Sequence, residues 1–414
     1  MQLSPKALGG ILLALLVAGV GYLFVLSRRN VRAPAGTTET GESTQNGPAL
    51  KWDFAIGSRH VTGAALGSDG NIYVGSNEGL YAVSPNGKLA WQYPVLTGMH
   101  APAVVTPDGI IYVTTSWGGF QSVNPDGTKR WDSRYGMIGF ESSPTLGNGI
   151  LYLANTVSDV WAFDPSAATP LLWELATSRS GMVNSARALP GSASANQARS
   201  AASPVLGPDG NLYVPRQQWL HSFGRDGTER WRISPTAGAL GQAAAGEDGT
   251  IYVGASDSSY TSKLLAVDTD GAIRWQIDVE QRVLGSAVVD KLGGVYFCSI
   301  DKLTALTPDG QVKWQFNGAG QCSSSPTLTE DGTLYLGIVP NHLIGVKSDG
   351  NLKWSLATRG NVSWPPVIAP DGTIYATTDS GDVIALRDSG SPLMSNAWPR
   401  YQHDSQNTGH IVGL

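Results

Sequence analysis

Short segments in which apolar and polar residues alternate recur along the chain from residue 51 onwards. Early examples are Asn71–Ser76 (NIYVGS), Gly79–Ser84 (GLYAVS) and Lys88–Tyr93 (KLAWQY). Alternation with a period of two is typical of half-buried β-strands. Asp-Gly and Asn-Gly pairs lie between many of these segments, and they favour the positive φ angles of tight hairpin turns. The pattern therefore predicts consecutive antiparallel hairpins.

The hairpins belong to a longer repeat. Tryptophan occurs at positions 52, 91, 131, 173, 231, 275, 314, 354 and 398, a spacing of about 40 residues with one longer interval. In each of eight units a Gly precedes a Tyr by three residues, from Gly70 and Tyr73 to Gly372 and Tyr375. Two tight turns per unit make 16, and 13 of them carry Asp-Gly or Asn-Gly, so the register is kept along the whole repeat.

Eight such units predict an all-β fold, an eight-bladed β-propeller of four-stranded blades over residues 51–414. An open stack of the same units would leave sheet faces uncovered at both ends, whereas a closed ring covers them. The repeat begins on a tryptophan strand around Trp52 and ends two strands after its last Gly-x-x-Tyr turn. We therefore expect the first strand to complete the last blade beside the strand at Asp382–Arg387.

The N-terminal segment differs in character from the repeat. Residues 7–26 (ALGGILLALLVAGVGYLFVL) are 20 uncharged, mostly apolar residues, enough for a helix to cross the hydrocarbon core of a membrane. We predict one transmembrane helix within an anchor of residues 1–32, followed by a flexible linker of residues 33–50. A cleaved signal peptide is the alternative, although the apolar stretch is long for one. One lysine precedes the helix and three arginines follow it, too small a difference to fix the orientation.

The charge and the motifs of the remaining chain exclude several functional classes. Four of the 28 basic residues and two of the 33 acidic residues precede residue 51, so residues 51–414 carry a net charge of −7. Nucleic-acid binding needs a basic footprint, which is missing. The six histidines are scattered, and the sequence motifs of hydrolases, metalloproteases and phosphate loops are absent. We therefore expect no nucleic-acid partner, no metal and no cofactor.

Several units resemble the PQQ-like propeller repeat, also called the quinoprotein-dehydrogenase-like repeat. The match is close in residues 143–173, 264–275 and 325–335. The C-terminal segment Trp398–Gly409 (WPRYQHDSQNTG) is similar to a segment that often flanks such propellers. The resemblance implies that the repeated tryptophan docks between neighbouring blades. His403 and Asp404 could form a polar catalytic pair, but no nucleophile is in register, so we expect a structural role at the seam of the ring.

The resemblance leaves two functional classes open. One comprises dehydrogenases that use the quinone and a calcium ion. The other comprises non-enzymatic propellers, such as the lipoprotein of the outer-membrane assembly machinery. The enzymes carry a vicinal Cys-Cys disulfide and a Glu/Asn/Asp calcium set, whereas Cys298 and Cys322 are not adjacent. We expect a membrane-anchored, non-enzymatic binding or scaffold module for a protein or cell-envelope polymer. A PQQ-dependent oxidoreductase and a polysaccharide-binding propeller are the alternatives.

The loops indicate where binding would occur. The short Asp-Gly and Asn-Gly turns are expected on one face. The loops between second and third strands share the other face with the blade-to-blade crossings, and we call it the variable face. Variable loops on a rigid scaffold often carry binding residues, and Arg and Trp are frequent interface anchors. The candidate binding residues are His100, Trp117, Arg134, Phe140, Glu141, Arg179, Arg216, Trp219, Arg282, Arg359 and Trp364.

The two cysteines are relevant to the cellular compartment of the propeller. Cys298 is expected to end a second strand in the sixth unit and Cys322 to precede the first strand of the seventh. Adjacent blades could bring them within the roughly 4.4–6.8 Å Cα separation of a disulfide, which would indicate an oxidising compartment. Together with the envelope location common in the family, this favours a propeller outside the cytoplasm, in the periplasm or at the cell surface. A cytoplasmic propeller is the alternative.

Overall fold

The computed structural model describes residues 47–58, 60–116, 119–134, 140, 142–155, 159–166, 171–175, 202–235, 239–256, 262–318, 320–395 and 397–409. The predicted anchor and most of the predicted linker lie outside these residues. Within them, no helix is long and apolar enough to cross a membrane.

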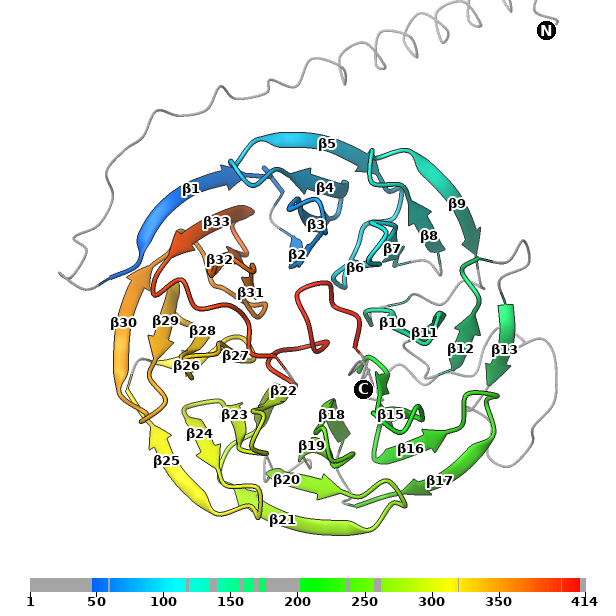
Figure 1. The fold of residues 1–414 in the computed structure, drawn as a ribbon, viewed down its shortest axis with the longest axis vertical. Helices are drawn as coiled ribbons and strands as arrows, with labels where there is room; N and C mark the ends of the chain where they lie inside the picture. The colour runs from blue at the N-terminus through cyan, green and yellow to red at the C-terminus, as the bar shows by residue number, and fades with distance from the viewer. Residues whose placement is uncertain are drawn as a thin grey trace, which may run out of the picture. The chain divides into compact units, whose positions relative to one another are not determined.

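The described residues form eight antiparallel sheets arranged around a common centre (Figure 1). This confirms the predicted eight-bladed propeller. We number the blades in chain order, each from its innermost to its outermost strand. Blade 1 contains β2 (Val61–Leu66), β3 (Ile72–Ser76), β4 (Gly79–Val83) and β5 (Leu89–Pro94). Blade 2 contains β6 (Val104–Val105), β7 (Ile111–Thr114), β8 (Gly119–Val123) and β9 (Lys129–Arg134). Blade 3 contains β10 (Thr145–Gly147), β11 (Ile150–Ala154), β12 (Val160–Phe163) and β13 (Leu171–Leu175). Blade 4 contains β14 (Val205–Leu206), β15 (Leu212–Arg216), β16 (Trp219–Phe223) and β17 (Glu229–Ile233).

The second half of the ring continues this order, with one blade split and one blade shared between the chain's two ends. Blade 5 contains β18 (Ala239–Ala245), β19 (Ile251–Ser256), β20 (Ser262–Val267) and β21 (Ile273–Val279). Blade 6 contains β22 (Val283–Val289), β23 (Val295–Ser299), β24 (Leu303–Leu306) and β25 (Val312–Phe316). In blade 7, β26 (Gln321–Cys322) and β27 (Thr327–Leu328) both pair with β28 (Leu334–Val339), followed by β29 (His342–Val346) and β30 (Leu352–Ala357). Blade 8 contains β31 (Val367–Ile368), β32 (Thr373–Thr377), β33 (Asp382–Arg387) and β1 (Ala49–Ala55).

The ring closes through β1, the outermost strand of blade 8. β1 runs antiparallel to β33, with Ala49 opposite Arg387 and Ala55 opposite Asp382. The predicted pairing of the first strand with residues 382–387 is therefore confirmed. β1 begins at Ala49, two residues before the predicted start of the propeller.

The burial of the strands differs from the predicted half-buried pattern. In blade 1 every residue of β3 and β4 is buried, whereas β5 alternates between exposed and half-buried residues. The middle strands are covered on both faces because blades pack against blades. Small side chains make this packing close: a Cβ added to Gly75 would lie 2.7 Å from the Met99 side chain. Alternation is thus a property of the outermost strands alone.

Each outermost strand carries one tryptophan that packs on the tyrosine of its own blade. The eight Tyr–Trp ring centroids lie 5.5–6.1 Å apart. These are the tyrosines that follow the first turn of each unit, such as Tyr73 with Trp91. An aromatic pair of this kind contributes about 0.5–1.5 kcal/mol beyond area burial.

The same tryptophans join each blade to the next. In six of them the indole N–H donates to a carbonyl in the last turn of the following blade, at 2.8–3.0 Å. The glycine of that turn lies against the ring. Gly127, with φ of +84°, would place a Cβ 2.6 Å from Trp91. The Asp-Gly pair is therefore required both by the turn and by the neighbouring ring.

The antiparallel order of the strands sorts the loops onto two faces. Turns between first and second strands and between third and fourth strands share one face, which we call the turn face. The remaining loops and the crossings share the variable face.

The C-terminal segment crosses the centre of the ring at the turn face (Figure 1, red). Its carbonyls accept hydrogen bonds of 2.7–3.1 Å from residues at the ends of six innermost strands. The donors are the N–H groups of Leu66, Val105, Leu146, Leu206, Val289 and Leu328, and the acceptors belong to residues 398–409. The segment was expected at the seam of the ring, but β1 forms the seam and this segment closes the centre. We call residues 398–409 the plug.

Buried polar side chains hold the plug in shape. Arg400 is 1% exposed and donates to the carbonyls of Pro366 and Asp404 and to the Asn407 side chain. Asp404 accepts from the N–H groups of Gln406 and Thr408 at 3.0 and 2.9 Å. The contacts of Asp404, including a 3.5 Å approach to His403, thus support the backbone of the plug.

Asn407 links the plug to two blades, and its loss should destabilise the fold. Its side-chain amide donates to the carbonyls of Ala64 in blade 1 and Ala103 in blade 2, at 3.1 and 3.0 Å. Asn407→Ala leaves both buried carbonyls without this donor, so we expect a loss of roughly 2–4 kcal/mol in the free energy of unfolding. Denaturant titration measures it. Asn351→Ala, in an exposed turn, is the matched control, and equal stability of the two variants would contradict the assigned role.

The cysteines lie in one hydrophobic cluster between blades 6 and 7. Both are buried, and the structure holds them as free thiols. Burial raises the pKa of the Cys298 thiol well above its usual range, and the adjacent Cys322 raises it further. A disulfide between them stays a prediction. Because a buried thiol ionises poorly, the bond should form during folding rather than afterwards.

We expect protein isolated from membranes under alkylating conditions to contain a Cys298–Cys322 disulfide. Mass spectrometry of the non-reduced digest detects it, with Cys322→Ser as the control that should show a free Cys298. Complete alkylation of both cysteines in the denatured, unreduced protein would contradict the prediction.

Candidate functional site

The wall of the central channel is polar on one side. Blades 3 to 7 each carry a buried polar side chain within the first strand or just before it: Ser143, Ser203, Gln242, Ser286 and Ser325. These side chains join neighbouring blades. The N–H of Ser143 donates to Ser203 Oγ at 3.0 Å, and the N–H of Ser203 donates to Gln242 Oε1 at 2.7 Å. Most of their hydrogen-bonding capacity is thus used within the wall.

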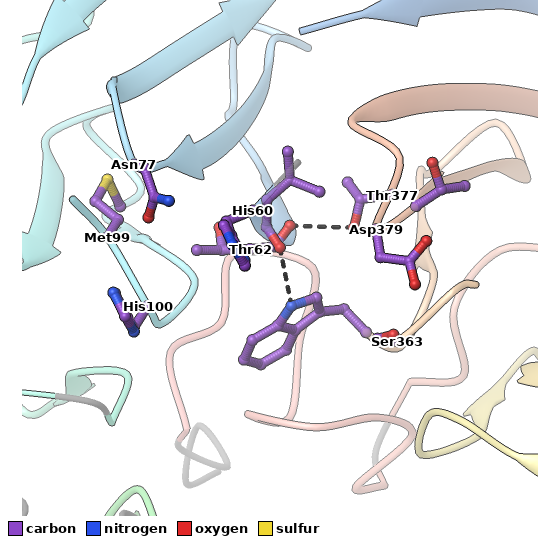
Figure 2. Close-up of a pocket in the computed structure, with 11 residues that line it drawn as sticks. His60, Thr62, Asn77, Met99, His100, Ser363, Thr377 and Asp379 are labelled. Atoms are coloured by element: carbon purple, nitrogen blue, oxygen red, sulfur yellow. Dashed lines mark hydrogen bonds between the residues drawn. The ribbon is translucent and has the colours of Figure 1, made fainter. Parts of the chain in front are cut away.

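A pocket of about 360 Å³ opens on the variable face over blades 8, 1 and 2. Its lining comes from five loops and crossings, as Figure 2 shows for the labelled residues. The lining residues are His60, Val61, Thr62, Asn77, Met99, His100, Ser363, Trp364, Thr377, Thr378 and Asp379. All of these segments belong to the variable face, which places the pocket where the sequence predicted binding.

Trp364 forms the aromatic side of the pocket. It is half-buried, and its indole N–H donates to the Val61 carbonyl at 3.2 Å. Its ring lies 6.1 Å from that of Tyr401 in the plug. The Tyr401 hydroxyl in turn lies 2.8 Å from Ser203 Oγ in the channel wall. The plug therefore supports the pocket from the turn face.

The polar groups of the pocket differ in how firmly they are held. Asp379 accepts from the N–H and side-chain amide of Asn361 at 2.8 and 2.9 Å. Thr377 donates to the Thr62 carbonyl at 3.1 Å, which ties blade 8 to blade 1 (Figure 2). His60 and His100 are exposed at the rim. The pocket thus combines one aromatic wall, a fixed carboxylate and two exposed imidazoles.

Arg359 does not line the pocket, but Asp382 links it to the pocket residue Thr378. Its guanidinium bridges Asp53 at 2.8 Å and Asp382 at 3.3 Å. Asp382 also accepts from Thr378, a pocket residue, at 3.3 Å. Arg359 therefore joins β1 to β33 in blade 8 and supports the pocket loop rather than facing a ligand alone.

A second group of predicted residues lies on blade 4. Arg216 and Trp219 are opposite each other in the pairing of β15 with β16. Arg216 is 8% exposed, whereas Trp219 is 36% exposed, and the Arg232 guanidinium lies 5.5 Å from the Trp219 ring centroid. We call Arg216, Trp219 and Arg232 the Arg216 patch.

The remaining predicted residues do not join either group. Phe140 is fully buried and packs edge-on against Trp161 at 5.3 Å, so it belongs to the core and not to the binding surface. Arg282 is exposed in the crossing between β21 and β22. The backbone of Arg134 ends β9. Trp117, Glu141 and Arg179 lie outside the described residues.

Sequence reasoning missed several pocket residues. It selected His100 and Trp364, but not His60, Asn77 or Asp379. A signal was available, because each of these follows or precedes a strand at the variable face. These residues come together because ring closure brings blade 8 beside blade 1. Loop length alone does not predict such a contact.

The residues present do not match a quinone and calcium site of the enzyme type. Among the described residues, no group of three or more His, Cys, Asp or Glu side chains is placed to hold a metal ion. The cysteines lie in the blade core and not at the pocket. We derive no chemistry through such a cofactor.

The comparisons with known proteins agree with the fold. The family model described as outer membrane protein assembly factor BamB matches residues 41–218 and 216–411. The structure of BamB from Moraxella catarrhalis is 13% identical, with 83% of this chain and 98% of that chain covered and a TM-score of 0.65. No curated protein sequence matches the chain.

Two dehydrogenases share the fold. A europium-containing methanol dehydrogenase is 11% identical, with 80% of this chain and 84% of that chain covered and a TM-score of 0.59. The quinohemoprotein alcohol dehydrogenase from Comamonas testosteroni is 11% identical, with 84% and 77% covered and a TM-score of 0.61. At these identities the structural likeness shows the propeller alone. Because the family model covers nearly the whole propeller, the chain belongs to the PQQ-like family described as outer membrane protein assembly factor BamB.

Proposed function

We propose that this chain is a non-enzymatic binding module of the cell envelope that holds a protein partner on its variable face. The observation that carries the proposal is that the plug covers one face of the ring while the pocket opens on the other. The plug closes the turn face by hydrogen bonds to six blades, whereas the variable face opens into the pocket at Trp364 and His100. A rigid ring with one open, loop-bearing face is suited to binding.

The family supports a scaffold role. Its model is described as an assembly factor for outer-membrane proteins, and a protein of that name has the same fold. An assembly factor needs a stable surface and no reacting groups. The fixed carboxylate of Asp379 and the exposed imidazoles of the pocket can position a polar partner group without chemistry.

A sugar polymer is the second candidate partner. The pocket pairs the half-buried indole of Trp364 with the exposed side chains of Asn77 and His100. An aromatic face beside neutral hydrogen-bonding groups can stack on and orient a sugar ring. A protein partner and a sugar polymer would bind the same pocket, so one experiment distinguishes them.

We further propose that residues 7–26 anchor the chain and that the propeller lies outside the cytoplasm. The family's description links its namesake to the assembly of outer-membrane proteins. The linker, rich in small hydroxyl residues, suits a spacer between a bilayer and a folded domain.

Partner binding should depend on the pocket. We expect His100→Ala and Trp364→Ala to reduce the partner retained from detergent-solubilised membranes by about tenfold or more, as for buried interface anchors. Quantitative mass spectrometry of the retained material measures it. Protease treatment before the retention step removes a protein partner and leaves a sugar polymer.

The control is Lys88→Ala, an exposed residue on the turn face. His100 has an exposed side chain, so its variant keeps the proposal testable if Trp364→Ala fails to fold. Unchanged retention by a folded His100→Ala and a folded Trp364→Ala would contradict the proposed role of the pocket.

The side of the membrane is tested with protease added to intact spheroplasts. We expect the propeller to be degraded or released while a cytoplasmic marker stays intact, because the positive charges flanking the helix are too few to prevent export. A propeller that is protected until the membrane is broken would place it in the cytoplasm.

A further inference from the structure

Among the described residues, two arginines are more than nine-tenths buried, and they differ in one respect. Arg400 is 1% exposed and has acceptors in Pro366, Asp404 and Asn407. Arg216 is 8% exposed, yet its buried Nε has no hydrogen-bond partner among the described residues. Its guanidinium also forms no ion pair within 4.0 Å in the part of the chain that the structure describes. A buried, unpaired charge of this kind costs stability.

The two carboxylates near Arg216 contact other side chains. Asp159 and Glu229 attract the guanidinium from a distance, but burial outweighs them and lowers the pKa of Arg216 to about 10, so it stays charged at neutral pH. Glu229 lies 2.8 Å from His221 Nδ1. Asp159 accepts from the Asn155 side chain at 3.3 Å. Neither carboxylate forms an ion pair with the Arg216 guanidinium in the described part of the chain.

His221 does not compete for the same ligand. Burial lowers its pKa to about 4, with Arg216 as a further cause and Glu229 opposing the shift. The imidazole is therefore neutral at pH 7 and donates to Glu229, since a neutral ring can carry its proton on Nδ1. Arg216 is left as the charged donor of this site.

The surroundings of Arg216 fit an amphipathic acidic segment. Trp219, directly opposite in the β15–β16 pair, is an exposed aromatic surface beside the arginine. Arg232 lies over this ring, is exposed, and forms no ion pair with the described acids. Three other arginines of the described chain pair with aspartates, namely Arg230, Arg274 and Arg359. The patch thus presents two uncompensated cations on a chain with an excess of acid.

We propose that Arg216 binds a carboxylate side chain from an acidic segment of a protein partner, with Trp219 packing on its apolar part and Arg232 as the second cation. The proposal rests on the proposed function that the variable face holds a protein. It adds a site away from the pocket and a chemical class for the partner.

A carboxylate fits better than a phosphate. A guanidinium and a carboxylate are both planar and can form two parallel hydrogen bonds. Only a small part of Arg216 is exposed, which favours a small planar group over a bulky tetrahedral one. Asp159 and Glu229 nearby would repel a dianion more strongly than a single negative charge.

The test uses the full chain in detergent and a fluorescent peptide in which glutamate and phenylalanine alternate. The matched peptide carries glutamine in place of glutamate. We expect the glutamate peptide to bind at least about tenfold more tightly, and Arg216→Gln to remove this difference, because a desolvated charge pair loses affinity when one partner is neutralised. Fluorescence anisotropy measures both. Arg282→Gln, which removes an exposed arginine of the same face, should bind like the wild type.

A second measurement separates binding from a structural role. Arg216→Met should shift the thermal unfolding midpoint upwards, because the buried charge is removed and the stem is kept. An arginine that served the fold alone would give a downward shift. An Arg216→Gln protein that still prefers the glutamate peptide would overturn the proposal.

A competition experiment tests the chemical class of the ligand. Inorganic phosphate that displaces the glutamate peptide at lower concentration than acetate would overturn the carboxylate assignment. The peptide experiment uses purified protein, so its failure is distinguishable from a failure of membrane-partner retention by the pocket variants.

Discussion

The tryptophan on each outermost strand is the interaction on which the rest of this structure depends. Its ring packs on the tyrosine of its own blade, and in six cases its N–H reaches the last turn of the next blade. A single blade is apolar on both faces of its middle strands and cannot be stable in water alone. Because each tryptophan needs a following blade, only a closed ring provides one for all eight. Trp52, delivered by β1 from the N-terminal side, supplies the eighth.

Ring closure creates a second requirement at the centre. The innermost strands end there with N–H groups that no further strand can pair, and buried backbone donors must find acceptors. The plug provides them, at six of the eight blades. Its own buried charge, Arg400, is compensated by carbonyls and an amide of the plug and of blade 8. The consequence for function is geometric: with the turn face closed, loops that meet a partner must lie on the variable face.

The sequence was sufficient for the fold because the fold rests on local, repeated signals. The spacing within one unit and its neighbour places a Gly against each tryptophan ring and a Tyr beside it. The same reasoning failed for Phe140, which loop position marked as exposed and which packs on Trp161 instead. It also could not place the plug, whose hydrogen bonds join residues 398–409 to strands throughout the chain. The pocket unites His60 with Asp379 only because blade 8 closes on blade 1. Such contacts depend on the completed ring, so the periodicity of the sequence does not predict them.

The two buried arginines differ in whether the fold supplies them with hydrogen-bond acceptors. Around Arg400 the propeller supplies acceptors at close range to a charge that it buries. At Arg216 the nearby acids contact Asn155 and His221 and form no ion pair with the arginine in the described part of the chain. A side chain that served packing alone could be replaced by an apolar one of similar volume with no loss. The site is thus arranged as a donor without an acceptor, at the end of a strand on the open face and beside an exposed indole. An acceptor that arrives from another molecule gives that arrangement a physical reason.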